Sequence, residues 1–226
     1  MRPTRRQFVV GSLGASALGV AGSAHGKGAK KADDDDVTPT EDLMREHGIL
    51  RRILLVYGEV IRRVDARQDV RPEWISGSAT IVREFIEDYH EKDEEEYVFP
   101  RLVRAGKLTD LVTILVAQHQ AGRRVTADVL RLATPAGLQS DSSKRQLSDA
   151  LRAFIRMYEP HAAREDTVLF PAFRALLNER ELKKLMDVFE DKEKALPHGG
   201  FEKMVEEVAR IEQSIGIYDL AKFTPA

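Results

Sequence analysis

A repeated pattern of histidine and glutamate constrains this chain more strongly than any other feature of its sequence. Each half reads His-x-x-x-Arg-Arg, then a long interval, then His-x-x-x-Glu-x-x-x-x-Phe-Pro. The first histidines of the two halves are 72 residues apart (119 − 47), and the second histidines are 71 apart (161 − 90). Four of the six histidines in the chain belong to this repeat. Its members are His47, His90, Glu94, His119, His161 and Glu165.

Apolar residues follow the period of an α-helix from residue 38 onward. They recur at steps of three and four, which places them along one face of a helix. Breaks fall at residues 68–72, 105–107 and 134–137, and each break contains proline or glycine. No alternating strand pattern of useful length is present. The sequence therefore predicts an all-α fold, and short connections between long helices favour an antiparallel up-and-down four-helix bundle.

Two capping motifs mark the ends of the predicted bundle. The segment Thr38-Pro39-Thr40-Glu41 combines an N-cap residue, a proline and a glutamate in the order of a capping box. Asn178 and Glu181 repeat that signal further along the chain. We therefore expect the bundle to span residues 38–177, and residues 178–226 to form a helical extension with two shorter helices packed on it.

The loops are placed so that the repeated histidines meet at one level. Two residues on neighbouring antiparallel helices lie at the same height when the turn falls midway between them. The midpoints between successive histidines are 68.5, 104.5 and 140, and each coincides with a predicted connection. A spacing of four residues then places each glutamate beside its histidine on one helix face.

Metal binding is the best explanation for four imidazoles and two carboxylates inside an apolar bundle. A buried carboxylate must be paired, protonated or bound to a cation. Because the chain has no cysteine, only nitrogen and oxygen ligands are available. Such a set suits a pair of iron or manganese ions better than tetrahedral zinc. The alternative is a metal-free layer of Glu/His pairs that fixes the register of the helices.

Several residues beside the repeat are expected to have ordinary structural functions. Arg51 and Arg123 could reach the site through hydrogen bonds, but solvated positions beside surface acids are favoured. An acidic flank could help iron to enter, but a solvated helix face is favoured for it. Its members are Asp88, Glu91, Asp93, Glu95 and Glu96. Tyr158 is expected to pack on the amphipathic face of its helix.

The charge of the chain gives no reason to expect a nucleic-acid partner. It contains 35 basic and 37 acidic residues, for a formal charge of −2. No global positive field is therefore available to attract a polyanion. With 42% hydrophobic residues in 226, the chain is long enough to bury a substantial core.

Residues 1–24 resemble a twin-arginine export signal. Arg5 and Arg6 precede a weakly apolar run that ends in the small residues 22–24. We therefore expect the twin-arginine export machinery as a partner and a periplasmic or extracellular location. Residues 25–37, with four consecutive aspartates, are expected to form a disordered charged linker. The alternatives are a basic cytoplasmic N-terminus and an uncleaved membrane anchor, for which the 17 uncharged residues 8–24 are short.

The repeat resembles the ligand pattern of hemerythrin-like, HHE-type cation-binding domains. The resemblance covers residues 40–215 and includes both Phe-Pro pairs, at 99–100 and 170–171. It implies a non-haem di-iron site in a four-helix bundle, with the six residues of the repeat as ligands. It also implies a small ligand, namely oxygen, nitric oxide or hydrogen peroxide, at an open metal position. An iron-donating or sensing function is a further possibility within the family.

One position departs from the oxygen-carrying hemerythrins. Arg123 stands where they have a further histidine, and arginine cannot ligate a metal, so reversible oxygen transport is not expected. A binding or sensing module and an enzyme remain, and an enzyme would need an external electron donor, since no electron-transfer cofactor motif is visible. A ferritin-like site is a weaker alternative. Glu87-x-x-His90 fits its motif, whereas the equivalent Tyr158-x-x-His161 does not.

Overall fold

The structure, a computed structural model, describes residues 37–225 of the 226-residue chain. Within that range every regular element is helical and no strand is present, which confirms the predicted all-α class. The predicted export signal, residues 1–24, lies outside the described residues, as does all of the predicted linker except its last residue. None of the helices within residues 37–225 offers the apolar run that a membrane span requires.

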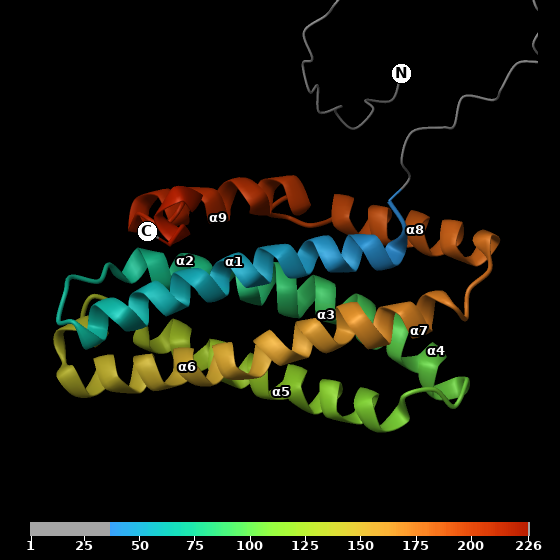
Figure 1. Ribbon diagram of the computed structural model, residues 1–226, viewed down its shortest axis with the longest axis horizontal. Coiled ribbons are helices and arrows are strands. Elements are labelled where there is room, and N and C mark those ends of the chain that lie inside the picture. The colour runs from blue at the N-terminus through green and yellow to red at the C-terminus, as the bar shows by residue number, and fades with distance from the viewer. Residues whose placement is uncertain (1–36, 226) are drawn as a thin grey trace, which may run out of the picture. The chain divides into compact units, whose positions relative to one another are not determined.

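Four helical rods form an antiparallel up-and-down bundle (Figure 1). The first rod is α1 (Pro39–Asp65) and the third is α5 (Thr109–Leu132). The second rod is a continuous helix made of α2 (Pro72–Ile81), η1 (Val82–His90), α3 (Glu91–Asp93), η2 (Glu94–Val98) and α4 (Phe99–Arg104). The fourth is made of α6 (Asp141–Arg164), η4 (Glu165–Leu169) and α7 (Phe170–Arg174). Helix α6 packs on α1 and α5, and α2 packs on the same two helices, which closes the bundle.

The ends of the rods follow the predicted local signals. The Thr38 side chain accepts from the backbone N–H of Glu41, and the Glu41 carboxylate accepts from the backbone N–H of Thr38. Asn178 forms the same reciprocal pair with Glu181 at the start of α8. Gly106, in the connection between the second and third rods, has φ +62°, a conformation that favours glycine. Both predicted capping boxes are therefore confirmed.

The second rod contains two π-helical segments, η1 and η2, and the fourth contains one, η4. Both η2 and η4 begin at a glutamate of the repeat. In η2 the N–H of Phe99 donates to the carbonyl of Glu94, five residues earlier. In η4 the N–H of Phe170 donates to the carbonyl of Glu165 in the same way. A proline follows in both halves, and its ring would clash with the carbonyl four residues earlier in a regular α-helix. The wider turn gives that ring room, and such turns are frequent at functional sites.

The C-terminal residues form two helices that run along one side of the bundle. These are α8 (Glu179–Lys194) and α9 (Phe201–Ile215), followed by a short 3₁₀ turn, η5 (Leu220–Phe223). Helix α9 packs on α1 and α2, and α8 packs on α1. Figure 1 shows α5 on the opposite side of the bundle from α8 and α9. The first rod is therefore covered along its outer side by the C-terminal helices.

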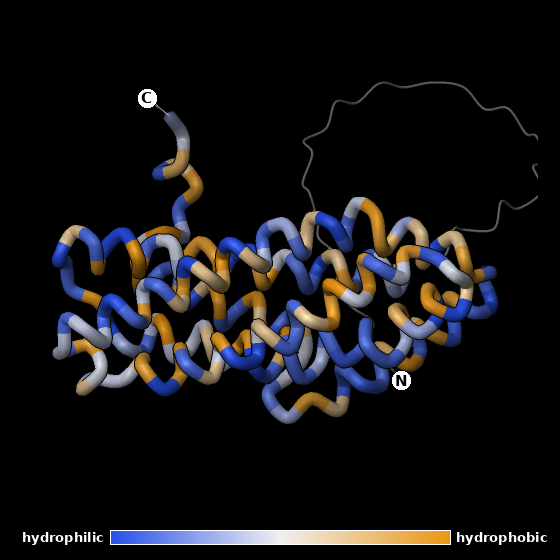
Figure 2. Tube along the Cα trace, turned by 90° about the horizontal axis from the view of Figure 1, so that it is seen from below, coloured by the Kyte–Doolittle hydropathy of each residue, from blue (hydrophilic) through white to orange (hydrophobic). Residues whose placement is uncertain are grey.

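A buried polar layer divides the hydrophobic core into two parts. Figure 2 shows hydrophobic and hydrophilic residues alternating along the rods, as in amphipathic helices. One cluster of buried apolar residues includes Leu50, and the other includes Leu43. His47 lies between these two leucines on α1 and is fully buried. The polar residues of the repeat thus occupy a cross-section with apolar packing on either side.

Candidate metal centre

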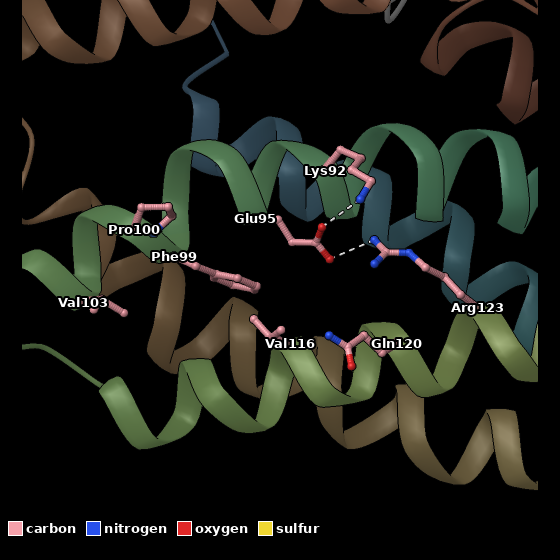
Figure 3. A pocket seen from close by; sticks show the side chains of 8 residues that line it. All are labelled: Lys92, Glu95, Phe99, Pro100, Val103, Val116, Gln120 and Arg123. Carbon is pink, nitrogen blue, oxygen red and sulfur yellow. Dashed lines mark hydrogen bonds and ion pairs between the residues drawn. The ribbon is translucent and has the colours of Figure 1, made fainter.

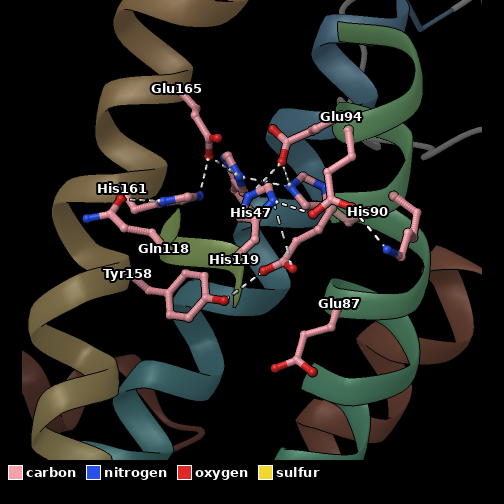
Figure 4. Close-up of polar contacts among 12 residues, drawn as sticks. His47, Glu87, His90, Glu94, Gln118, His119, Tyr158, His161 and Glu165 are labelled. Atoms are coloured by element: carbon pink, nitrogen blue, oxygen red, sulfur yellow. Dashed lines mark hydrogen bonds and ion pairs between the residues drawn. The ribbon is translucent and has the colours of Figure 1, made fainter. Parts of the chain in front are cut away.

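The structure brings all six residues of the repeat to one level of the bundle (Figure 4). They come from all four rods, and each is at most 4% exposed. The sequence-predicted convergence is therefore present in the fold, and metal binding by these residues stays a prediction. The six residues are His47 on α1, His90 on η1, Glu94 on η2, His119 on α5, His161 on α6 and Glu165 on η4.

The six residues fall into two groups, one from each half of the chain. His47, His90 and Glu94 form the first group, here named position A. The second group, position B, consists of the equivalent residues His119, His161 and Glu165. In each group one donor atom per residue lies within 4.8 Å of the others. Each position therefore has the size and the ligand types of a metal site.

Each glutamate also reaches the other position. Glu165 Oε2 lies 3.0 Å from His161 Nε2 and 3.3 Å from His47 Nε2. Glu94 Oε2 lies 3.6 Å from His90 Nε2 and 3.4 Å from His119 Nε2. Each carboxylate thus stands between histidines from both halves of the chain. A carboxylate in this place can bridge two metal ions.

The outer nitrogen of every histidine pairs with a side-chain oxygen. In all four rings Nε2 faces the centre of the layer, and Nδ1 faces outward. The Nδ1 partners are Asp166 for His47 (2.7 Å), Glu46 for His90 (2.8 Å), Glu95 for His119 (3.1 Å) and Gln118 for His161 (2.8 Å). Such partners fix the orientation and the tautomer of metal-binding histidines. They leave Nε2 facing the centre of the layer, where the Nε2 atoms of His47 and His90 lie 3.1 Å apart.

The first arginine of each Arg-Arg pair, Arg51 and Arg123, holds one of these outer carboxylates. Arg51 pairs with Asp166, and Arg123 Nη2 lies 2.8 Å from Glu95 Oε1. The prediction of solvated arginines beside surface acids was therefore wrong for Arg123, which is 22% exposed and pairs with Glu95, a partner of His119. Arg51 is 47% exposed, but it contacts the same kind of carboxylate. Both arginines act on the centre through the histidine partners rather than through the glutamates of the repeat.

The two glutamates of the layer differ in their electrostatic environment. All four oxygens of Glu94 and Glu165 are buried without a hydrogen-bond partner among the described residues. Burial raises the pKa of Glu94 well above its usual value, and the nearby charge of Glu165 raises it further. Burial has the same effect on Glu165, but His161 and His47 hold its pKa below the usual value. A cation between these groups would satisfy both carboxylates.

The histidines also differ in their electrostatic environment. Burial lowers the pKa of His90 well below its usual value, and the neighbouring His47 lowers it further. Burial also lowers the pKa of His119, against the opposing effect of Glu95. For His47, burial lowers the pKa, but Asp166 and Glu165 together outweigh that effect, and the pKa is raised. Low pKa values keep an imidazole neutral, which is the form that binds metal.

A second buried polar network lies beside the histidines. The Tyr158 hydroxyl donates to Glu91 Oε1 at 2.7 Å, and Arg123 Nη2 lies 2.9 Å from Glu91 Oε2. Glu91 and Asp93 are each only 1% exposed, so the prediction that they lie on a solvated helix face was wrong. Glu91, Glu95 and His119 also form a group with metal-ligand spacing. Arg123 occupies that place, however, and supplies the positive charge there.

Gly122 makes room for the tyrosine of this network. A Cβ atom at Gly122 would lie 1.9 Å from the Tyr158 hydroxyl oxygen. At Gly48, another helical glycine, a Cβ atom would meet nothing within 4 Å. We therefore expect Gly122→Ala to lower the free energy of unfolding by about 1–3 kcal/mol, as overpacking does. Gly48→Ala should raise it by up to about 1 kcal/mol.

Urea denaturation of both glycine variants measures this difference. The variant Gly122→Ala/Tyr158→Phe serves as a control, because removal of the hydroxyl relieves the closest contact. It should recover part of the lost stability. Equal stability of the two single variants would show that Tyr158 does not need the space at Gly122.

The chain belongs to the Hemerythrin HHE cation binding domain family. Two overlapping segments, residues 38–173 and 110–216, match this family. The matches together cover the whole bundle and α8 and α9, and they agree with the sequence resemblance and with the His/Glu groups of the structure. The fold and the site therefore define a metal-binding helical protein.

The curated relatives include mycobacterial proteins without an assigned activity. The uncharacterized protein Rv1995 of Mycobacterium tuberculosis is 49% identical over 191 residues, which cover 84% of this chain and 75% of the relative. The uncharacterized protein Mb2018 of Mycobacterium bovis has the same identity and coverage. No solved structure matches this chain. The names of these relatives state no activity, so the activity of this chain is inferred from the site.

Proposed function

We propose that the six residues of the repeat bind a pair of iron ions, and that this centre binds or reacts with oxygen, nitric oxide or hydrogen peroxide. The observation that carries the proposal is the burial of four carboxylate oxygens without hydrogen-bond partners, beside four inward-facing Nε2 atoms. Such a layer is costly unless a cation occupies it. Two ions with bridging carboxylates would satisfy all of these atoms.

The chemistry of the donor set fits iron or manganese. Imidazole nitrogens and carboxylate oxygens without any thiolate suit these metals. Two carboxylates shared between positions A and B do not fit two separate tetrahedral zinc sites. Iron is the metal that the family resemblance implies, and manganese is the alternative. When bound, iron would supply an exchangeable coordination position and a change of oxidation state.

The residues of the chain orient the ligand atoms and keep water away. The rings of Phe99 and Phe170 stack on His119 and His47 at 5.5 Å between ring centroids. These phenylalanines belong to the second apolar cluster and are at most 3% exposed. Arg123 stands one helical turn after His119 and pairs with carboxylates. It adds no ligand, which supports a ligand set with an open position.

Metal analysis of anaerobically purified protein tests the ligand assignment. We expect close to two iron ions per chain in the wild type. The double variant His90→Ala/Glu165→Ala removes one ligand from each position and should retain none. Gly48→Ala, a substitution at an open helix position, should retain both ions. Full iron content in the double variant would contradict the assignment.

Anaerobic stopped-flow mixing distinguishes binding from catalysis. A stable and reversible adduct with oxygen or nitric oxide supports a binding or sensing module. Repeated turnover of peroxide or nitric oxide with an added reductant supports an enzyme that uses an external electron donor. Transfer of iron to an acceptor would favour the third possibility, an iron-donating protein.

We also propose export by the twin-arginine machinery, on the basis of residues 1–24. This route carries folded proteins, which would allow the metal to be inserted before export. Replacing Arg5 and Arg6 by lysine should retain the protein in the cytoplasm, as measured by cell fractionation. Unchanged fractionation would contradict the proposed export. It would not bear on the proposal that the chain binds iron.

A further inference from the structure

Positions A and B differ in one hydrogen-bond partner. His90 Nδ1 and His161 Nδ1 each lie 2.8 Å from a side-chain oxygen. The partner of His90 is the carboxylate of Glu46, and the partner of His161 is the amide of Gln118. These partners occupy equivalent places in the repeat, 72 residues apart (118 − 46). The geometry is therefore repeated, whereas the partner group is a carboxyl in position A and an amide in position B.

The remaining outer partners do not offset this difference. His47, in position A, pairs with Asp166, and His119, in position B, pairs with Glu95. Both partners are carboxylates, and each is held by an arginine. Position A thus has two carboxylate-paired histidines, and position B has one. A carboxylate partner makes an imidazole a stronger ligand, and loss of such a partner typically costs about 10–100-fold in metal affinity.

A surface groove also lies beside position B. A groove of about 560 Å³ lies between the second rod and α5 (Figure 3). Glu95 and Phe99 line this groove, and both contact His119 of position B. Only one layer of side chains therefore separates the groove from that histidine. His47 of position A contacts Asp166, which is 17% exposed, and neither of these residues lines the groove.

We propose that the centre holds its two metal ions unequally, with a retained ion at position A and an exchangeable ion at position B. The groove beside His119 is the route by which the second ion leaves and re-enters, and by which a small chelating molecule reaches it. This inference rests on the proposed function, because it requires the six residues to bind two ions. It goes further by assigning a different affinity and a different exchange rate to each position.

Anaerobic titration of the metal-free protein with iron(II) tests the unequal affinity. The wild type should bind two ions in two steps whose dissociation constants differ by about 10-fold or more. Glu46→Gln should weaken the tighter step about 10–100-fold, and Gln118→Glu should strengthen the weaker step by a similar factor. Two equal steps in the wild type, or equal effects of each variant on both steps, would overturn the inference.

Removal of iron by a chelator tests the exchange route. The wild type should lose one ion in a fast phase and the other in a slow phase. Gln120, an exposed residue of the groove, can be replaced by tryptophan to fill the groove. Ile114→Trp is the matched control, since Ile114 is 55% exposed on the same helix and is absent from the groove lining.

Gln120→Trp should slow the fast phase at least several-fold, and Ile114→Trp should leave both phases unchanged. Loss of both ions in one phase, or a fast phase that Gln120→Trp does not change, would contradict the groove route. Wild-type protein that binds no iron would contradict the proposed function itself. Wild-type protein that binds two equivalent ions would contradict only the unequal positions, so the two failures are distinguishable.

Discussion

Glu94→Met is expected to stabilise the metal-free protein, whereas Glu165→Met is expected to destabilise it. Burial raises the pKa of Glu94 well above its usual value, which favours the uncharged form, and neither of its oxygens has a hydrogen-bond partner among the described residues. Replacement by an apolar side chain of similar length should therefore raise the free energy of unfolding by about 1–3 kcal/mol. Glu165 lies closer to two histidines, which hold its pKa low. Glu165→Met should therefore lower the free energy of unfolding by about 3 kcal/mol, as expected when one partner of a buried ion pair is removed.

Urea denaturation in the presence of a chelator measures both changes, and metal analysis accompanies it. Both variants should lose metal binding, because each glutamate is shared by positions A and B. The stability and the metal content of the two variants together distinguish a metal centre from a metal-free structural layer. If the layer existed to fix the helix register, both glutamates would contribute to stability. A loss of stability on replacing Glu94 would thus favour the structural alternative.

The six residues of the repeat could be found from the sequence because their spacing is a property of single helices and loop lengths. Each glutamate follows its histidine by four residues, and each loop lies midway between two histidines. These distances fix the level of a side chain in an antiparallel bundle without any knowledge of packing. The two capping boxes are equally local, since they depend on residues three positions apart.

The outer partners of the histidines were not predicted, because they act between rods. Glu46 precedes His47 in the chain but pairs with His90 on the neighbouring rod. The spacing of residues along one helix does not predict a contact with a residue on another helix. A signal was nevertheless present, since the residues before the first histidine of each half, Glu46 and Gln118, are related by the same shift of 72 residues as the histidines.

The burial of Glu91 was missed for a related reason. A run of acidic residues normally indicates a solvated face, and the sequence gives no sign of the groups that pair with it. Glu91 is buried because Tyr158 and Arg123, on two other rods, supply a hydrogen bond and a positive charge. The π-helical turns were missed because helix periodicity assumes a regular α-helix. The Phe-Pro pairs, each a proline within a helical pattern, were their local signal.

Addition of iron(II) to the metal-free wild type under anaerobic conditions is expected to raise its melting temperature by about 10 °C or more. A ligand at 100 times its dissociation constant stabilises a folded protein by about 2.7 kcal/mol, so two ions contribute about 5 kcal/mol. For a chain of this size each kcal/mol shifts the melting temperature by about 2–4 °C. A bound metal would also satisfy the buried oxygens of Glu94 and Glu165, which have no hydrogen-bond partner among the described residues.

Two controls identify the source of this stabilisation. Magnesium prefers an all-oxygen environment that keeps several waters, so it should shift the melting temperature far less than iron(II). Glu94→Met should melt at the same temperature with and without iron(II), because its shared carboxylate is gone. An unchanged melting temperature of the wild type would contradict metal binding by this layer. An equal shift in Glu94→Met would place the stabilising ion elsewhere in the chain, since both positions depend on that carboxylate.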